Sequence, residues 1–153
     1  MTVSDNWIAL VPEDPMYVPS AQSRERALER FRKLAPDADD IEIKVCDKTQ
    51  FFECGANFER ITCPACGAEI PMDWWQNRMD DDYTEDGFAL SPYPVPCCQV
   101  LRSLNDLVYE WPQCFGRFAL DAMNPNIGKL EPEVIAEFER ILGTRVRAIY
   151  QHI

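Results

Sequence analysis

Four of the seven cysteines of this 153-residue chain form two close pairs, and this spacing constrains the fold more than any other feature. The first pair lies in the segment Cys63-Pro64-Ala65-Cys66-Gly67, and the second pair, Cys97-Cys98, follows after 30 intervening residues. Two thiolates separated by two residues can hold one tetrahedral ion when the loop between them folds back. Gly67 allows the positive φ angle that brings backbone N–H groups towards the sulfur atoms.

Together the two pairs predict a structural zinc site with the ligands Cys63, Cys66, Cys97 and Cys98. Soft thiolates select zinc, and the sequence lacks a cysteine run typical of an iron–sulfur cluster. Four protein ligands close the coordination sphere, whereas a catalytic zinc keeps one position open. Adjacent side chains of a regular strand point to opposite faces, so both cysteines of the second pair can ligate only if the backbone turns there. Otherwise the candidates for a fourth ligand are Cys114, Cys54 and His152.

The other three cysteines, Cys46, Cys54 and Cys114, are predicted to be reduced thiols of the core. The chain begins without the basic and apolar regions of a signal peptide and has no apolar run of membrane-spanning length, so we expect a cytoplasmic protein. An odd number of cysteines in a reducing compartment disfavours a disulfide framework. A thioredoxin-like redox role for the first pair is also disfavoured, because Gly67 and Pro71 oppose the helix that such a motif opens.

Hydrophobic periodicity predicts an α+β fold in which two helices cover an antiparallel sheet. The predicted helices are 21–35 and 131–142, the second with a proline in its first turn and Gly143 after its last. Alternating or short apolar runs predict strands over 7–11, 41–45, 50–54, 58–62 and 145–150. Residues 105–111 and 115–123 are interpreted as the two strands of a hairpin, although the second could be a helix.

This order of elements predicts a single domain over residues 1–153 that contains an inserted zinc-ribbon-like lobe over residues 58–100. Without the insertion, the order is close to the split β-α-β plan of ferredoxin-like sandwiches, and other α+β arrangements remain open. The lobe is expected to contain a short helix over 72–82 and an extended, proline-rich segment over 88–95.

Charge limits the class of partner. The chain carries 26 Asp and Glu residues against 15 Lys and Arg, a net charge of −11 at pH 7. Nucleic-acid binding needs a dominant basic footprint, so this balance disfavours it. The charge fits either a basic protein partner or no partner, and the basic protein partner is the hypothesis pursued. A candidate partner-binding segment combines two tryptophans with five acids, and it comprises Trp74, Trp75, Asp80, Asp81, Asp82, Glu85 and Asp86. Tryptophans anchor interfaces and carboxylates steer cationic partners, but a core tryptophan beside a solvated acidic loop has the same pattern.

Two further groups of side chains admit a functional and a structural interpretation. A polar and aromatic group is either a site or a turn that satisfies backbone groups, and it contains Asn105, Asp106, Tyr109, Glu110 and Trp111. A basic face of the first predicted helix either attracts a phosphate-bearing ligand or faces solvent, and it contains Arg24, Arg26, Arg30, Arg32 and Lys33. The glycine-rich nucleotide-binding motifs and the serine-hydrolase and zinc-protease motifs are absent from the sequence.

Three segments carry a resemblance to a known family. The first two are Cys63-Pro64-Ala65-Cys66-Gly67 and Pro96-Cys97-Cys98, and the third, SLNDLVYEWP, spans 103–112 and precedes Phe115-Gly116-Arg117-Phe118. They resemble an uncharacterised family of small bacterial zinc-ribbon-like proteins, over residues 60–150. The resemblance implies that the cysteines and the segment 103–112 belong together, and it implies no activity.

These observations favour a non-catalytic, zinc-stabilised acidic protein that occludes a basic protein partner, in the manner of an immunity protein that inhibits a bacterial toxin. One alternative is an enzyme with an Asp, Glu and Tyr site, or an open zinc position, near the lobe. The third hypothesis is a zinc-ribbon nucleic-acid binder. It is the least favoured, because only Arg60, Arg78 and Arg102 lie near the cysteines in the sequence.

Overall fold

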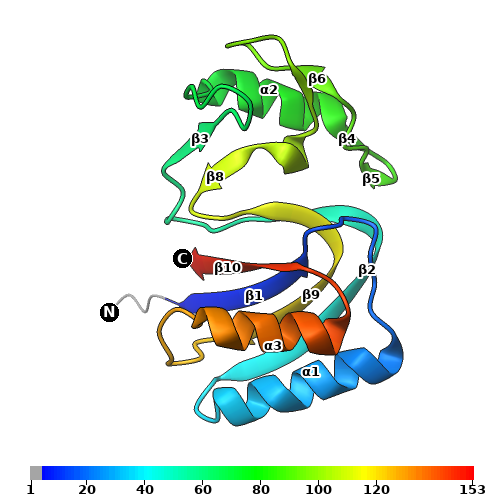
Figure 1. Cartoon of the computed structure of the whole chain (residues 1–153), viewed down its shortest axis with the longest axis vertical. Helices are drawn as coiled ribbons and strands as arrows, with labels where there is room; N and C mark the ends of the chain where they lie inside the picture. The colour runs from blue at the N-terminus through cyan, green and yellow to red at the C-terminus, as the bar shows by residue number, and fades with distance from the viewer. Residues whose placement is uncertain (1–4) are drawn as a thin grey trace.

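The computed structural model describes residues 5–153, and a six-stranded sheet forms their frame (Figure 1). The prediction that the chain begins without a signal peptide involves residues 1–4, which lie outside the described residues. The strand order is β10-β1-β9-β2-β5-β4. Its four long strands are β1 (Asn6–Pro12), β2 (Asp40–Phe52), β9 (Cys114–Met123) and β10 (Val146–His152).

The four long strands have the order of a ferredoxin-like sandwich. Strand β1 pairs antiparallel with β10 and with β9, and β9 pairs antiparallel with β2. Helix α1 (Ala21–Leu34) connects β1 to β2 with β9 lying between them, and helix α3 (Pro132–Leu142) connects β9 to β10 with β1 lying between them. Each connection is therefore a split β-α-β unit. The predicted α+β class is confirmed.

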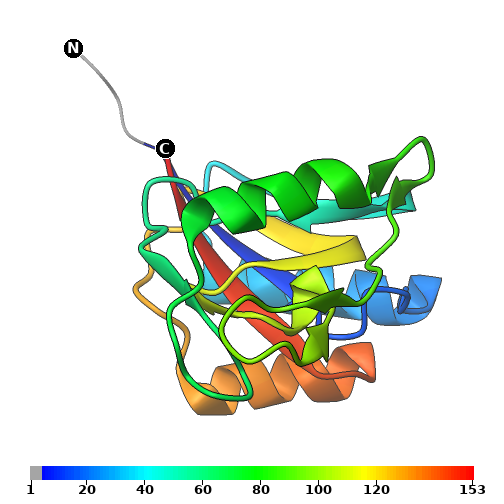
Figure 2. The same cartoon turned by 90° about the horizontal axis from the view of Figure 1, so that it is seen from above.

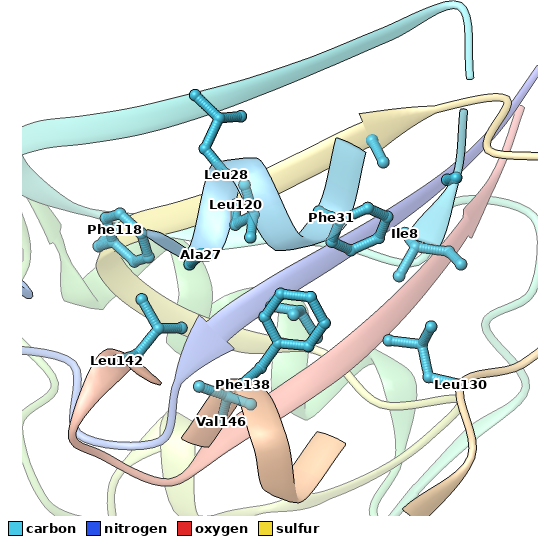
Figure 3. Packing of buried hydrophobic residues seen from close by; sticks show 13 residues of the cluster. Ile8, Ala27, Leu28, Phe31, Phe118, Leu120, Leu130, Phe138, Leu142 and Val146 are labelled. Atoms are coloured by element: carbon cyan, nitrogen blue, oxygen red, sulfur yellow. The ribbon is translucent and has the colours of Figure 1, made fainter. Parts of the chain in front are cut away.

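Both helices begin and end within one residue of the predicted bounds and pack on one face of the sheet (Figure 1). The Ser20 hydroxyl caps α1 by accepting a hydrogen bond from the Ser23 N–H, and Gly143 ends α3 with φ of 78°. The core between helices and sheet is apolar (Figure 3), and its buried side chains include Ile8, Leu28, Phe31, Phe118, Leu120, Phe138 and Leu142. An ion pair of 2.8 Å between Arg30 and Glu137 joins the two helices at their outer side.

Two predictions about strands need correction. Residues 41–45 and 50–54 do not form separate strands, because β2 is continuous from Asp40 to Phe52 with an irregularity in its pairing between Val45 and Gln50. The predicted hairpin of 105–111 with 115–123 is wrong. Residues 104–106 form a single 3-10 turn, and strand β8 (Val108–Glu110) pairs with β3 (Arg60–Thr62) instead. The second of these segments is the strand β9 rather than a helix.

The cysteine-bearing lobe lies on the side of the sheet opposite α1 and α3, and the view from above shows α2 and the loops of the lobe in front of the strands (Figures 1 and 2). Its helix is α2 (Met72–Asp82). Its remaining short strands are β4 (Tyr83–Thr84), β5 (Gly87–Phe88), β6 (Tyr93–Pro94) and β7 (Leu101–Arg102). The β3–β8 pair brings residues 108–110 beside the predicted lobe 58–100. None of the α-helices in residues 5–153 has the length and apolar content needed to cross a bilayer.

Aromatic side chains connect the lobe to the sheet. Trp75 of α2 lies 5.9 Å from Phe51 of β2 and 5.4 Å from Phe58, measured between ring centroids. Its indole N–H donates to the Tyr109 hydroxyl at 3.1 Å, and that hydroxyl donates to the Leu104 carbonyl at 2.6 Å. Large aromatic rings in this arrangement bury much apolar area, so the lobe has a core of its own that continues into the sheet.

Candidate metal centre

The four predicted ligand cysteines lie together, and their Sγ atoms are all within 4.8 Å of one another. The distance is 3.8 Å between the Sγ atoms of Cys63 and Cys98 and 3.3 Å between those of Cys66 and Cys97. A tetrahedral ion with metal–sulfur bonds of about 2.3 Å separates its sulfurs by about 3.8 Å. A disulfide would need about 2.05 Å, so these are free thiols in ligand-like positions.

The first cysteine pair sits in a tight turn that points both sulfurs to one side. The Gly67 N–H donates to the Cys63 carbonyl at 2.9 Å, and the Cys63 N–H donates to the Ala68 carbonyl at 2.8 Å. Gly67 has φ of 77°, a conformation that residues with a Cβ rarely adopt. The Ala65 N–H also points at the Cys63 sulfur, 3.4 Å away. The turn therefore fixes the positions of the two sulfurs and supplies an N–H donor to one of them.

The second cysteine pair sits in a turn of the same design. The Gln99 N–H donates to the Val95 carbonyl at 2.9 Å, and the Val95 N–H donates to the Val100 carbonyl at 3.0 Å. Gln99 has φ of 63° where the first turn has its glycine. The residue spacing of these hydrogen bonds matches the first turn, so Cys98 takes the place of Cys66. Because the chain turns here, adjacent cysteines can both face the site.

The two turns differ in where their other sulfur comes from. Val95 takes the place of Cys63 and is fully buried in the core of the lobe. The missing sulfur is supplied by Cys97, which takes the place of Ala65. The shared feature in the sequence is the proline in the second position of each turn, Pro64 and Pro96. Aligning the two prolines would have predicted this turn and the position of Cys98.

The alternative candidates for a fourth ligand, Cys54, Cys114 and His152, do not belong to the cluster of four sulfurs. Cys54 and Cys114 belong to an apolar cluster of the sheet, and burial raises the pKa of the Cys54 thiol to about 11 and of the Cys114 thiol to about 12. The His152 ring lies 2.7 Å from the Asn6 side-chain oxygen at the end of β10. Cys54 and Cys114 are thus buried thiols, as predicted, and Cys46 is half-buried on β2.

The electrostatics of the cluster suit a bound cation. Hydrogen bonds from the backbone N–H groups of Cys66 and Ala65 lower the pKa of Cys63 to about 6. The neighbouring Cys66 sulfur raises the pKa of Cys97 to about 12. Four sulfurs this close cannot all ionise together unless a positive ion compensates their charge. The donor set, soft and anionic, therefore fits a metal ion of the thiolate-binding class.

The candidate partner-binding segment divides into buried and exposed residues. Trp75 is only 9% exposed and belongs to the core of the lobe, so it cannot anchor a partner in this conformation. Asp82 is 1% exposed, and its carboxylate accepts hydrogen bonds from the backbone N–H groups of Leu90 and Ser91 and from the Tyr93 hydroxyl. The inclusion of these two residues in the partner surface is therefore wrong.

The rest of that segment reaches the surface. Asp80, Asp81, Glu85 and Asp86 are exposed and Trp74 is half-buried. The Arg78 guanidinium lies 5.7 Å from the Trp74 ring centroid and forms an ion pair of 2.8 Å with Asp81. Tyr83, which the sequence interpretation left out, is 61% exposed between the acids. Its place directly after the last turn of α2 is the signal that could have identified it.

The polar group at 105–111 has structural roles. The Asn105 amide donates to the Glu13 carbonyl at 3.2 Å and accepts from the Phe115 N–H at 3.0 Å. The Asp106 carboxylate caps the 3-10 turn through Ser103. The other three residues are also engaged: Tyr109 bonds Trp75, Glu110 pairs with Arg60, and Trp111 lies under Lys129.

No family model, curated protein or solved structure matches this chain, so its function is inferred from the geometry of its own residues.

Proposed function

We propose that this chain is a non-catalytic, zinc-stabilised acidic protein that occludes a basic protein partner with the exposed surface of its lobe. The observation that carries the proposal is the cluster of four cysteine sulfurs within 4.8 Å of one another. It joins the two turns at residues 63–67 and 95–99 and so ties the ends of the segment that carries α2.

Zinc is the ion that this donor set favours. Thiolates select it over hard cations, and four of them complete a tetrahedral sphere without leaving a position for water or substrate. Such a site contributes folding free energy rather than catalysis. An ion here would hold the turn at 63–67 against the turn at 95–99 and thereby rigidify the surface between them.

The partner surface of the proposal consists of the exposed part of the segment, with Tyr83 added to the predicted residues. It contains Trp74, Asp80, Asp81, Tyr83, Glu85 and Asp86. Carboxylates around aromatic rings steer a cationic partner and give it an apolar contact once it docks. An immunity-type inhibitor of a basic bacterial toxin is the class of protein that this mode of binding suits.

The zinc part is tested on the purified chain by elemental analysis and thiol counting. We expect one zinc per chain, with the four ligand cysteines protected from a thiol reagent until a chelator is added. Chelation should unfold the lobe, seen as a red shift of the tryptophan emission when Trp75 becomes exposed, while the helices on the far side of the sheet persist. A metal-free protein with the same melting temperature before and after chelation would contradict it.

The partner part is tested by photo-crosslinking in the cells from which the gene comes. A photoreactive residue at Tyr83 should capture a basic protein, and the same residue at the exposed Glu25 of α1 should not. The purified partner should then associate more slowly as salt rises. Capture only from position 25, or an association rate independent of salt, would contradict the proposal.

A matched pair of charge variants completes the test. One variant neutralises Asp80, Asp81, Glu85 and Asp86 to their amides, and the control neutralises Glu25, Glu29, Glu131 and Glu133, which are exposed on or beside α1 and α3. Both variants change the net charge equally. The first should slow association with the partner at least tenfold more than the control, and equal effects would show that only net charge matters.

A further inference from the structure

Strand β10 has a short open edge in a cleft between the sheet and the lobe. It is the last strand of the sheet, and among the strands of residues 5–153 it pairs with β1 alone, apart from an isolated bridge between Gly55 and His152. The ladder is closed by hydrogen bonds between Asp5 and Ile153 and between Glu13 and Arg145, which are hydrogen-bonded pairs of the antiparallel pattern. In that pattern, alternate residues bond the neighbour. The backbone groups of residues 146, 148, 150 and 152 therefore point away from β1.

At both ends of β10, backbone groups that point away from β1 already have hydrogen-bond partners. The His152 carbonyl accepts from the Ala56 N–H at 2.8 Å, and the His152 N–H donates to the Cys54 carbonyl at 3.3 Å. The Tyr150 carbonyl accepts from the Asn57 amide, and the Val146 N–H donates to the Glu139 carboxylate.

Four backbone groups in the middle of the row have no partner among residues 5–153. They are the Val146 carbonyl, the N–H and carbonyl of Ala148, and the Tyr150 N–H. This spacing is what an added strand requires, because it too bonds alternate residues of its neighbour. The open edge thus has room for about three residues of pairing, and no proline or lysine of β10 protects it.

The space beside this edge is hollow. A cavity of about 310 Å³ is lined by Val108 and Tyr109 on the lobe side and by Arg147 and Ala148 of β10. A second cavity of about 350 Å³ continues past Tyr150. It shares Tyr150 with a third cavity, of about 870 Å³, at the end of the sheet. The cavities follow β10 in the direction that an extended peptide would take.

The charges along the cleft favour a basic occupant. Its acidic lining residues are Asp37, Asp39, Glu59, Asp106 and Glu110. Glu110 pairs with Arg60 and Asp106 caps the 3-10 turn, whereas the other three form no ion pair among residues 5–153. The two basic lining residues are already engaged. The Arg147 guanidinium donates to the carbonyls of Gln113 and Asn105 at 3.1 and 3.3 Å, and the Lys129 ammonium lies 4.1 Å from the centroid of the Trp111 ring.

We infer that the open edge of β10 is a docking site for an extended, basic segment of a protein partner, which adds a strand to the sheet. Main-chain hydrogen bonds to residues 146, 148 and 150 supply the affinity, and the carboxylates of the cleft select lysine or arginine side chains. The inference goes beyond the proposed function, because this edge is a surface separate from α2 and requires no metal ion.

The test uses the full zinc-loaded chain and a fluorescein-labelled decapeptide of alternating lysine and threonine. We expect saturable binding of this peptide by fluorescence anisotropy. The same peptide N-methylated at every residue should bind at least tenfold more weakly. A peptide of alternating glutamate and threonine should not bind. In the free chain, amide exchange by NMR should be fast at Ala148 and Tyr150 and slow at Arg147 and Ile149. The basic peptide should slow exchange at the first two only.

Two variants locate the site. Ala148→Pro removes one outward donor at a position where edge strands tolerate proline, and it should weaken peptide binding about tenfold. Glu59→Gln with Glu110→Gln, both exposed, should weaken binding without altering the fold. The control Asp80→Asn with Asp81→Asn should leave it unchanged. Equal binding of the N-methylated peptide, protection of other amides, loss of binding in the control, or no saturable binding would overturn the inference.

Discussion

Replacing Asp82 by alanine tests whether this aspartate stabilises the fold, in contrast to the exposed acids of the same segment. Asp82 is 1% exposed, and its carboxylate accepts three hydrogen bonds, of 2.7 Å from the Leu90 N–H, 3.0 Å from the Ser91 N–H and 2.8 Å from the Tyr93 hydroxyl. These bonds hold residues 90–93 against the end of α2, and that segment leads into the second cysteine turn.

The magnitude follows from the donors that the substitution leaves without an acceptor. A hydrogen bond to a charged group contributes about 1.5–3 kcal/mol, and a buried donor left unpaired costs about 1–3 kcal/mol. Part of this cost is regained because the folded chain no longer desolvates a carboxylate. We therefore expect Asp82→Ala to lower the free energy of unfolding by about 3 kcal/mol or more.

The matched control is the neighbouring Asp81. Its carboxylate is 56% exposed and pairs with Arg78 on the surface, where an ion pair contributes about 0–1 kcal/mol. The assay is urea unfolding followed by tryptophan fluorescence at one saturating zinc concentration, so that metal binding is the same in all variants. If Asp82→Ala and Asp81→Ala shifted the free energy of unfolding equally, by less than about 0.5 kcal/mol, the assignment of Asp82 to the interior would be refuted.

Three further outcomes are expected. Gly55→Ala should lower the free energy of unfolding by about 2 kcal/mol or more, because φ is +61° and a Cβ would clash with the His152 carbonyl oxygen. Urea unfolding measures this, and an unchanged midpoint would contradict it. At pH 8, iodoacetamide should leave Cys54 and Cys114 unmodified in the native chain, since burial raises the pKa of both thiols, and mass spectrometry should find them alkylated only after denaturation. The Arg30 guanidinium holds the pKa of Glu137 below its usual value, so this pair stabilises the fold above about pH 4.5 and the stabilisation is lost as pH falls through the lowered pKa. The melting temperature of Glu137→Gln should therefore fall less on acidification than that of the wild type, and parallel curves would contradict the pairing.

The elements that the sequence predicted well are those whose signal is local. The helices α1 and α3 follow from apolar spacing, a capping serine at Ser20 and a closing glycine at Gly143, all within one stretch of chain. The cysteine pairs are likewise local, because the spacing of Cys63 and Cys66 and the prolines of both turns determine how each turn folds. The burial of Cys54 agrees with the general tendency of free cysteines to be buried, although Cys46 is only half-buried.

The features that the sequence did not predict depend on contacts between distant segments. Strand β8 pairs with β3 across about fifty residues, and no local periodicity distinguishes this from the predicted hairpin with β9. The run of aspartates at the end of α2 does not indicate which of them is buried and which is exposed. Asp82 is buried because residues 90–93 fold back against the end of α2 and donate hydrogen bonds to its carboxylate, whereas Asp81 remains exposed to solvent.

The sequence by itself indicated the helices of a two-layer α+β body, the four cysteines of the cluster and the acidic character of the lobe, because residue type, spacing and charge carry these directly. The tertiary structure decided which strands are neighbours, which of the acids and tryptophans face solvent, and which backbone groups of β10 remain open. The physical reason is that hydrogen bonds between strands and the burial of side chains are set by whichever remote segment completes the contact, and that partner is not encoded in the local pattern.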